Sequence, residues 1–159
     1  MQDSLVITRR NLPHWQVGGA TYFITFRVRQ GQLAASERDL VLKACLHWNA
    51  KKWQVYAVTV MPDHVHVLAQ PLEKEPGKWF SLAEILHSVK RHSAHQIGKQ
   101  RGRTGPVWLD ESLDRIVRDD AEFREKLLYI ANNAVKAELV EDPLAYAHFW
   151  WEGADEHRI

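Results

Sequence analysis

The chain has 159 residues, which is the length of one ordinary domain, and it is 45% hydrophobic and 26% charged, as is typical of a globular protein. No apolar run approaches the roughly 18 residues of a membrane span, and the N-terminus lacks the apolar centre of a signal peptide. We therefore expect no membrane partner, a cytoplasmic location and one domain over 1–159, with a core at about 15–140 and a tail at 141–159.

The net charge is only +1, but the charges are unevenly distributed along the chain. Residues 1–105 carry a net charge of +8, whereas residues 106–159 carry a net charge of −7. The stretch 87–103 contains five basic residues and no acid, and these are Lys90, Arg91, Lys99, Arg101 and Arg103. Such a stretch suits phosphate contacts, although an ordinary solvated helix face has the same pattern.

The N-terminal half of the chain predicts three strands and one helix. Alternation of apolar and polar side chains predicts a half-buried strand over 21–29. A helix is expected over 36–52, with Ser36 as its N-cap. Two β-rich runs at 53–60 and 64–70 flank the turn Met61-Pro62-Asp63, so we expect them to form a β-hairpin.

The C-terminal half predicts two helices separated by a short strand. A capping-box spacing at 81–84 predicts a helix that ends at about Gly98. A β-like run at 113–117 precedes a last helix that begins near 120, and the tail after 143 is expected to be irregular. This order predicts an α+β, ferredoxin-like sandwich, in which an antiparallel sheet has its helices packed on one face.

The pair His64 and His66 is the first candidate for chemistry. Side chains two residues apart on a strand project from the same face, so the two imidazoles can share one divalent metal ion. A third ligand would have to come from elsewhere. Strand histidines also occur as ordinary hydrogen-bonded residues. A zinc hydrolase of the His-x-His-x-Asp type is disfavoured, because the last position is Leu68.

Tyr129 and Asn133 are the second candidate, because they lie four residues apart on the predicted last helix and therefore share a face. The phenol of Tyr129 could attack a phosphate that a metal ion polarises, and the amide oxygen of Asn133 could complete the metal shell. The same spacing also describes ordinary residues of an amphipathic helix.

Three groups of residues resemble, in the same order, the REP-associated tyrosine transposases, which are single-tyrosine HUH transposases of the insertion-sequence-200-like kind. The first group resembles the start of these proteins and consists of Arg-Asn-Leu-Pro-His-Trp (10–15) and Gly-Ala-Thr-Tyr-Phe-Ile-Thr-Phe-Arg (19–27). The second resembles the HUH segment, and it reads Val-Met-Pro-Asp-His-Val-His-Val-Leu (60–68). The third resembles the tyrosine helix, and it reads Tyr-Ile-Ala-Asn-Asn-Ala-Val-Lys-Ala-Glu-Leu-Val (129–140).

The resemblance implies an enzyme that nicks and rejoins single-stranded DNA at REP-type hairpins. Tyr129 would form a 5′-phosphotyrosine link and free a 3′-hydroxyl. A Mg²⁺ or Mn²⁺ ion would be held by His64, His66 and Asn133. We expect the DNA phosphates to be contacted by Arg9, Arg10, Arg27 and Arg29 and by the basic stretch, Lys90, Arg91, Lys99, Arg101 and Arg103.

Some alternatives remain open at this point. The chain departs from the family at Ala134, where proline is usual, and at Glu138, where glycine is usual, and both positions bear on where the tyrosine helix ends. A domesticated DNA-binding protein with weakened catalysis is therefore one alternative, and a metal hydrolase that does not use Tyr129 is another. The family resemblance is compatible with a monomer and with a homodimer.

Overall fold

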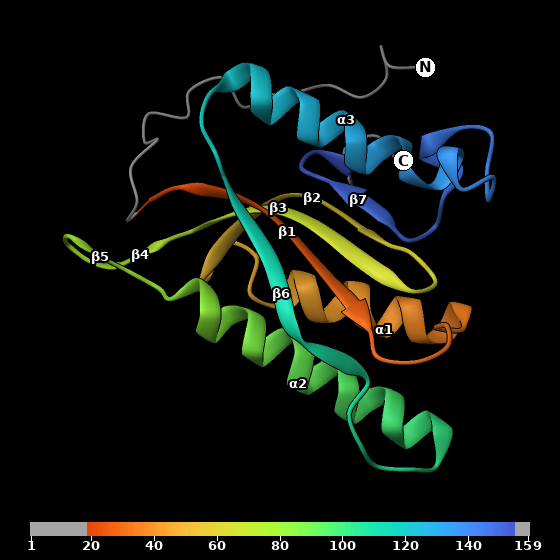
Figure 1. Cartoon of the computed structure of the whole chain (residues 1–159). Helices are drawn as coiled ribbons and strands as arrows, with labels where there is room; N and C mark the ends of the chain where they lie inside the picture. The colour runs from red at the N-terminus through yellow and green to blue at the C-terminus, as the bar shows by residue number, and fades with distance from the viewer. Residues whose placement is uncertain (1–18, 155–159) are drawn as a thin grey trace.

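A computed structural model describes residues 19–154, which form an antiparallel sheet of five strands covered by three helices (Figure 1). The predicted α+β class is therefore confirmed. The elements in chain order are β1 (Thr21–Val28), α1 (Ala35–His47), β2 (Trp53–Val60), β3 (His64–Pro71), β4 (Glu73–Glu75), β5 (Lys78–Trp79), α2 (Leu82–Arg101), β6 (Trp108–Val117), α3 (Asp120–Lys136), the 3₁₀ helix η2 (Pro143–Ala145) and β7 (Phe149–Trp151).

The strands of the main sheet lie in the order β6-β1-β3-β2-β7. β3 lies between β1 and β2 and is antiparallel to both, which is the split β-α-β arrangement of a ferredoxin-like plan. β2 and β3 form the predicted hairpin, and the turn between them contains Pro62, which cannot donate a backbone hydrogen bond to a ladder. β4 and β5 form a separate two-stranded hairpin.

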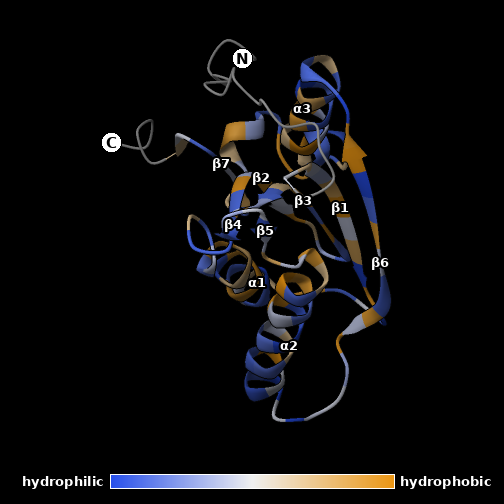
Figure 2. Cartoon of the chain, turned by 90° about the vertical axis from the view of Figure 1, so that its left-hand side faces the viewer, coloured by the Kyte–Doolittle hydropathy of each residue, from blue (hydrophilic) through white to orange (hydrophobic). Residues whose placement is uncertain are grey.

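Two apolar cores lie on opposite faces of the sheet. α1 and α2 pack on one face against side chains such as Ile24 and Val58. α3 packs on the other face, where Phe123 and Ile130 meet Leu68. Figures 1 and 2 show α1 and α2 on one side of the sheet and α3 on the other. The expectation that the helices share one face is therefore wrong for α3. The reason is that β2 and β3 are buried along almost their whole length, so both of their faces need an apolar cover.

Both ends of α1 differ from the prediction. The helix begins after Ala34 rather than at Ser36, because the Glu37 carboxylate accepts a hydrogen bond from the Ala34 backbone N–H at 2.8 Å. It also ends at His47, before the predicted boundary.

The C-terminal end of α2 also differs from the prediction, because the helix passes through Gly98 and ends at Arg101. Gly102 follows in the left-handed conformation that commonly ends a helix. Gly98 is needed for packing, since a Cβ atom there would lie 2.6 Å from the carbonyl oxygen of Arg103.

β6 and the tail are more ordered than the sequence predicts. β6 extends over ten residues, Trp108–Val117. The tail is not irregular throughout, because β7 pairs with β2 and places Trp150 opposite Val58. The hydroxyl of Tyr146 also donates a 2.6 Å hydrogen bond to the carbonyl oxygen of Val60. Within residues 19–154, no helix is both long and apolar enough to cross a bilayer.

Candidate active site

The two histidines project from the face of the sheet that α3 covers. Their ring centres lie 4.7 Å apart at the start of β3. His66 is only 4% exposed, whereas the His64 side chain is 17% exposed. On the neighbouring strand β1, Thr25 lies opposite His66 and Arg27 lies opposite His64. The pair is therefore partly shielded from water, and it can be approached from the His64 end.

A short contact orients each imidazole ring. The Thr25 hydroxyl lies 2.8 Å from Nδ1 of His66, and a carboxylate oxygen of Asp63 lies 2.7 Å from Nδ1 of His64. In both rings Nε2 is then the nitrogen that remains for a ligand. Burial lowers the pKa of His66 to about 3, with smaller contributions from His64, Arg27 and Lys126. His66 is therefore neutral near pH 7 and keeps a lone pair for a metal ion.

α3 brings Asn133 and Tyr129 to this pair. Oδ1 of Asn133 lies 3.3 Å from Nε2 of His64. The Tyr129 ring meets His66 edge-on, with ring centres 5.4 Å apart, and the residue is 44% exposed. Their spacing of four residues places them one helical turn apart. The phenol is therefore beside the histidines and open to a substrate.

The donor atoms fit a divalent ion of borderline hardness. Two imidazole nitrogens and one amide oxygen form a mixed nitrogen and oxygen set without thiolates, and Mn²⁺ accepts such a set. The 3.3 Å separation between His64 Nε2 and Asn133 Oδ1 is close to the distance of about 3.0 Å between adjacent ligands of an octahedral ion with 2.1 Å bonds. Residues 19–154 contain no cluster of three or more His, Cys, Asp or Glu side chains that could hold a metal. The oxygen that the structure places next to His64 Nε2 is the amide oxygen of Asn133.

Four residues near the site were missed by the sequence argument, and they are Phe23, Thr25, Asp63 and Lys126. Phe23 stacks on His66 with ring centres 5.3 Å apart and meets Tyr129 edge-on at 5.8 Å. Asp63 directly precedes His64 in the sequence, and this position could have indicated a partner for the His64 ring. Phe23 and Thr25 alternate on β1, but only the pairing of β1 with β3 places them beside His66.

The predicted DNA-contacting arginines of the N-terminal part have different surroundings. Arg9 and Arg10 lie outside the described residues. Arg27 is exposed and lies on the histidine face, since it alternates with Phe23 and Thr25 along β1. Arg29 forms an exposed ion pair with Asp110 at 3.2 Å. Among the described residues of the predicted set, Arg27 is thus the one that the structure brings to the histidines.

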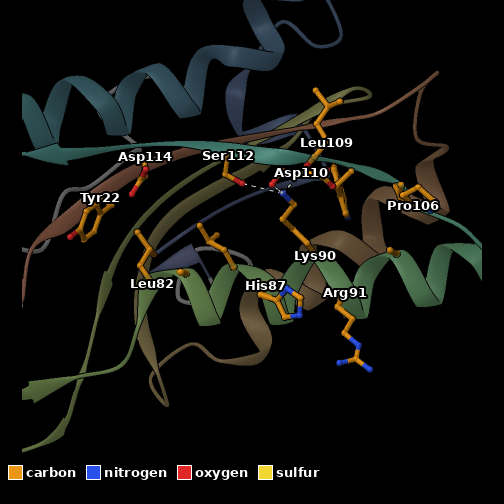
Figure 3. Close-up of a pocket in the computed structure, with 15 residues that line it drawn as sticks. Tyr22, Leu82, His87, Lys90, Arg91, Pro106, Leu109, Asp110, Ser112 and Asp114 are labelled. Atoms are coloured by element: carbon orange, nitrogen blue, oxygen red, sulfur yellow. Dashed lines mark hydrogen bonds between the residues drawn. The ribbon is translucent and has the colours of Figure 1, made fainter.

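The basic stretch of α2 lies on the opposite face of the sheet from the histidines. Lys90 lines a groove of about 690 Å³ between α2 and β6, where its ammonium donates to the carbonyls of Leu109 and Asp110 and to Ser112 (Figure 3). Burial lowers the pKa of Lys90. Arg91 also lines this groove, but its guanidinium extends away from β6 (Figure 3). Lys90 therefore joins α2 to β6 in this structure.

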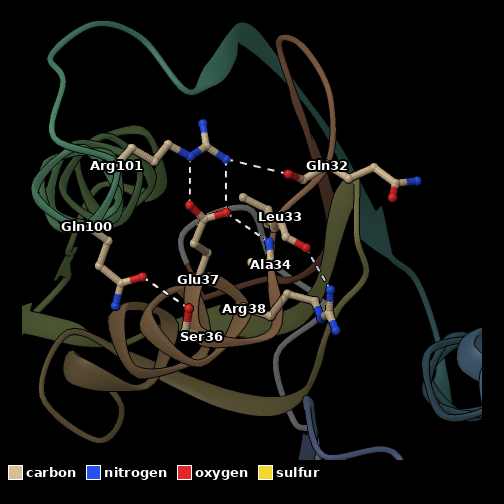
Figure 4. Close-up of polar contacts among 8 residues, drawn as sticks. All are labelled: Gln32, Leu33, Ala34, Ser36, Glu37, Arg38, Gln100 and Arg101. Carbon is tan, nitrogen blue, oxygen red and sulfur yellow. Dashed lines mark hydrogen bonds and ion pairs between the residues drawn. The ribbon is translucent and has the colours of Figure 1, made fainter.

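Arg101 also bonds within the protein, because its guanidinium forms two hydrogen bonds with Glu37, at 2.6 and 3.0 Å (Figure 4). Arg91, Lys99 and Arg103 are exposed. Of the five basic residues in this stretch, these three therefore have the most accessible charge.

The two departures from the family pattern are accommodated at the end of α3. Ala134 is buried and continues the helix, which ends at Lys136. Glu138 adopts a left-handed conformation with φ of 62°. The Leu139 N–H then bonds to the carbonyl of Ala134 at 2.9 Å, which closes the helix in the way a glycine at this position would. Tyr129 still lies beside His66.

The fold is shared with a solved transposase. The structure of a REP-associated tyrosine transposase bound to a REP hairpin matches with a TM-score of 0.70 at 18% identity, covering 91% of this chain and 82% of that chain. A Haemophilus influenzae protein named "Putative REP-associated tyrosine transposase" is 27% identical over 109 residues, which are 65% of this chain and 60% of that protein. No protein-family model matches the chain. The resemblance to REP-associated tyrosine transposases is therefore confirmed in sequence and fold, and the chain spans about 60% of the length of this relative.

Proposed function

We propose that this chain is a metal-dependent endonuclease and transposase that nicks and rejoins single-stranded DNA at REP-type hairpins through a 5′-phosphotyrosine intermediate. The observation that carries the proposal is the meeting of a phenol with three potential metal ligands on one face of the sheet, namely Tyr129 with His64, His66 and Asn133. The similarity to a transposase bound to a REP hairpin supports this class of substrate.

The metal would be Mg²⁺ or Mn²⁺, held by Nε2 of His64, Nε2 of His66 and Oδ1 of Asn133. When bound, such an ion neutralises charge on a phosphate and polarises its P–O bonds. Thr25 and Asp63 would orient the two rings through their Nδ1 atoms, as hydrogen-bond partners of metal-binding histidines generally do.

Tyr129 would supply the nucleophile. A bond forms between its phenolic oxygen and the phosphorus, and the bond from phosphorus to the 3′ oxygen breaks. The phenolic proton is lost to solvent, and the released 3′ oxygen takes up a proton. The phosphotyrosine conserves the energy of the broken bond, so a 3′-hydroxyl can later attack it and restore the phosphodiester.

The basic residues would divide between DNA binding and support of the fold. Arg27 would contact a phosphate beside the reacting one, because it lies opposite His64 on the same face. Arg91, Lys99 and Arg103 would contact more distant phosphates from the exposed side of α2 and the loop that follows it. Lys90 and Arg101 would chiefly support the fold through the bonds described above.

The test is the formation of a covalent protein–DNA adduct on denaturing gels. The probe is a labelled DNA hairpin with a randomised single-stranded extension, incubated with Mn²⁺ or Mg²⁺ or with a chelator. We expect a metal-dependent adduct that is lost in Tyr129→Phe and retained in the control Tyr22→Phe, because Tyr22 lines the α2 groove on the other face.

An adduct that survives Tyr129→Phe would overturn the assignment of the nucleophile. Hairpin binding without an adduct under either metal would instead support a DNA-binding protein that has lost cleavage. Turnover that is unaffected by Tyr129→Phe would support a metal hydrolase.

A further inference from the structure

Lys126 is a charged residue on the same helix as Tyr129, one turn before it. Its ammonium nitrogen lies 5.0 Å from the centre of the Phe23 ring. Phe23 in turn stacks on His66 and meets the edge of Tyr129. The ammonium group is therefore held beside an aromatic ring that contacts both a histidine and the phenol.

The residues of the site form a row along β1 and α3. At one end of this row, Asn133 faces His64. At the other end, Lys126 lies over Phe23. Tyr129 lies between them, because the three α3 residues are spaced by three and four positions and share one side of the helix. The phenol is thus flanked by the proposed metal ligands on one side and by an ammonium group on the other.

The charge of Lys126 acts within the site. Its side chain is only 20% exposed, so water screens its charge only in part. The carboxylate of Glu125 lies 3.5 Å from the ammonium but is 72% exposed, so water screens that pair. The ammonium group therefore remains available to an anion that enters between α3 and β1.

We infer that Lys126 binds a non-bridging oxygen of the phosphate that Tyr129 attacks, an inference that rests on the proposed function. Attack by the phenolic oxygen adds negative charge to the oxygens around the phosphorus. An ammonium already held in place, on the side away from His64 and Asn133, offsets this charge without reorganisation of the site.

The first test compares the rate of adduct formation at saturating hairpin DNA in three variants. Lys126→Met should slow the reaction about 100-fold, as does the loss of one preorganised charge-stabilising donor in other enzymes. Lys126→Arg keeps the charge and should restore most of the rate. The control Arg124→Met removes an exposed cation two residues away, from another side of α3, and should leave the rate unchanged.

Two outcomes of this comparison overturn the inference. The first is a Lys126→Met rate equal to that of Arg124→Met. The second is a loss of Mn²⁺ affinity in Lys126→Met, measured by electron paramagnetic resonance, because Lys126 would then merely support the metal ligands.

A second test needs no cleavage and no knowledge of the target sequence. The probes are thymidylyl-thymidine, which has one phosphodiester, and its uncharged methylphosphonate analogue, and NMR titration measures their binding to the Tyr129→Phe protein. Adding Lys126→Met should weaken binding of the charged probe about ten-fold and leave the neutral probe unaffected.

The outcomes separate the two proposals. If the unmodified protein forms no adduct but this difference appears, the proposed function fails and the Lys126 contact stands. If Lys126→Met changes the affinity for both probes equally, or for neither, the Lys126 contact fails whether or not an adduct forms.

Discussion

Thr25 and His66 face each other across the β1–β3 ladder, and the Thr25 hydroxyl lies 2.8 Å from Nδ1 of His66. If His66 binds a metal through Nε2, the Thr25 hydroxyl oxygen accepts a hydrogen bond from the Nδ1–H group and holds the ring in that orientation. Thr25→Val should therefore lower Mn²⁺ affinity about 10- to 100-fold, the usual cost of removing such a partner. Electron paramagnetic resonance of free Mn²⁺ measures this directly.

The matched control for Thr25→Val is Thr21→Val, on the same side of the same strand. The Thr21 hydroxyl is buried and has no hydrogen-bond partner among the described residues. We expect unchanged Mn²⁺ affinity and a free energy of unfolding that is equal or higher by about 1 kcal/mol, because an unsatisfied hydroxyl is removed. Equal losses of Mn²⁺ affinity in the two variants would contradict a specific role for Thr25.

Asn133 is expected to contribute an oxygen ligand, since its Oδ1 faces His64 Nε2. Asn133→Ala should lower Mn²⁺ affinity at least about ten-fold, whereas Asn133→Asp keeps an oxygen at this position and should raise it. Asn132→Ala is the control, because the Asn132 amide donates to the Leu128 carbonyl within the helix. Isothermal titration with Mn²⁺ distinguishes these variants, and equal affinity in Asn133→Ala and the unmodified protein would exclude the ligand role.

Glu37 should make stability depend on pH. The hydrogen bond from Arg101 lowers the pKa of Glu37 below its ordinary value, and the backbone N–H of Ala34 acts in the same direction. Because the folded-state pKa is lowered, the stabilisation is fully present above about pH 4.5 and is lost as pH falls through the folded pKa.

Glu37→Gln should accordingly lower the free energy of unfolding by about 2 kcal/mol at pH 7. The difference from the unmodified protein should shrink at pH 3.5, which lies below the ordinary pKa of a glutamate, because protonation of Glu37 in the unfolded chain then offsets the stabilisation. Urea denaturation at both values measures it. A difference that stays constant between them would show that the charge of Glu37 is unimportant.

Glu138 occupies the left-handed position that ends α3, where a residue with a Cβ atom is strained. Glu138→Gly should raise the free energy of unfolding by about 1 kcal/mol, which corresponds to about 2–4 °C in the melting temperature for a chain of this size. Ala137→Gly is the control, because Ala137 has φ of −82° and gains nothing from glycine. A melting temperature that falls in Glu138→Gly would contradict the strain argument.

The sequence alone determined the class of fold and the main candidates for chemistry. The β-rich composition of two neighbouring runs identified the strands of the central hairpin, because this composition and the Pro62 turn between the runs are local properties. The His-x-His spacing placed two imidazoles on one face of a strand, and the spacing of Tyr129 and Asn133 placed both on one side of a helix. These relations follow from the geometry of a single element and do not depend on the rest of the molecule.

Only the tertiary structure decided how these elements meet. The packing of α3 on the face opposite α1 and α2 places Asn133 beside His64, although 69 positions separate them. The β1–β3 register likewise brings Thr25 to His66. The basic stretch of α2, which the sequence suggested as a contact for DNA phosphates, lies on the other face. Local sequence patterns cannot predict which face of the sheet a helix covers, because that face depends on the apolar area that the whole sheet leaves uncovered.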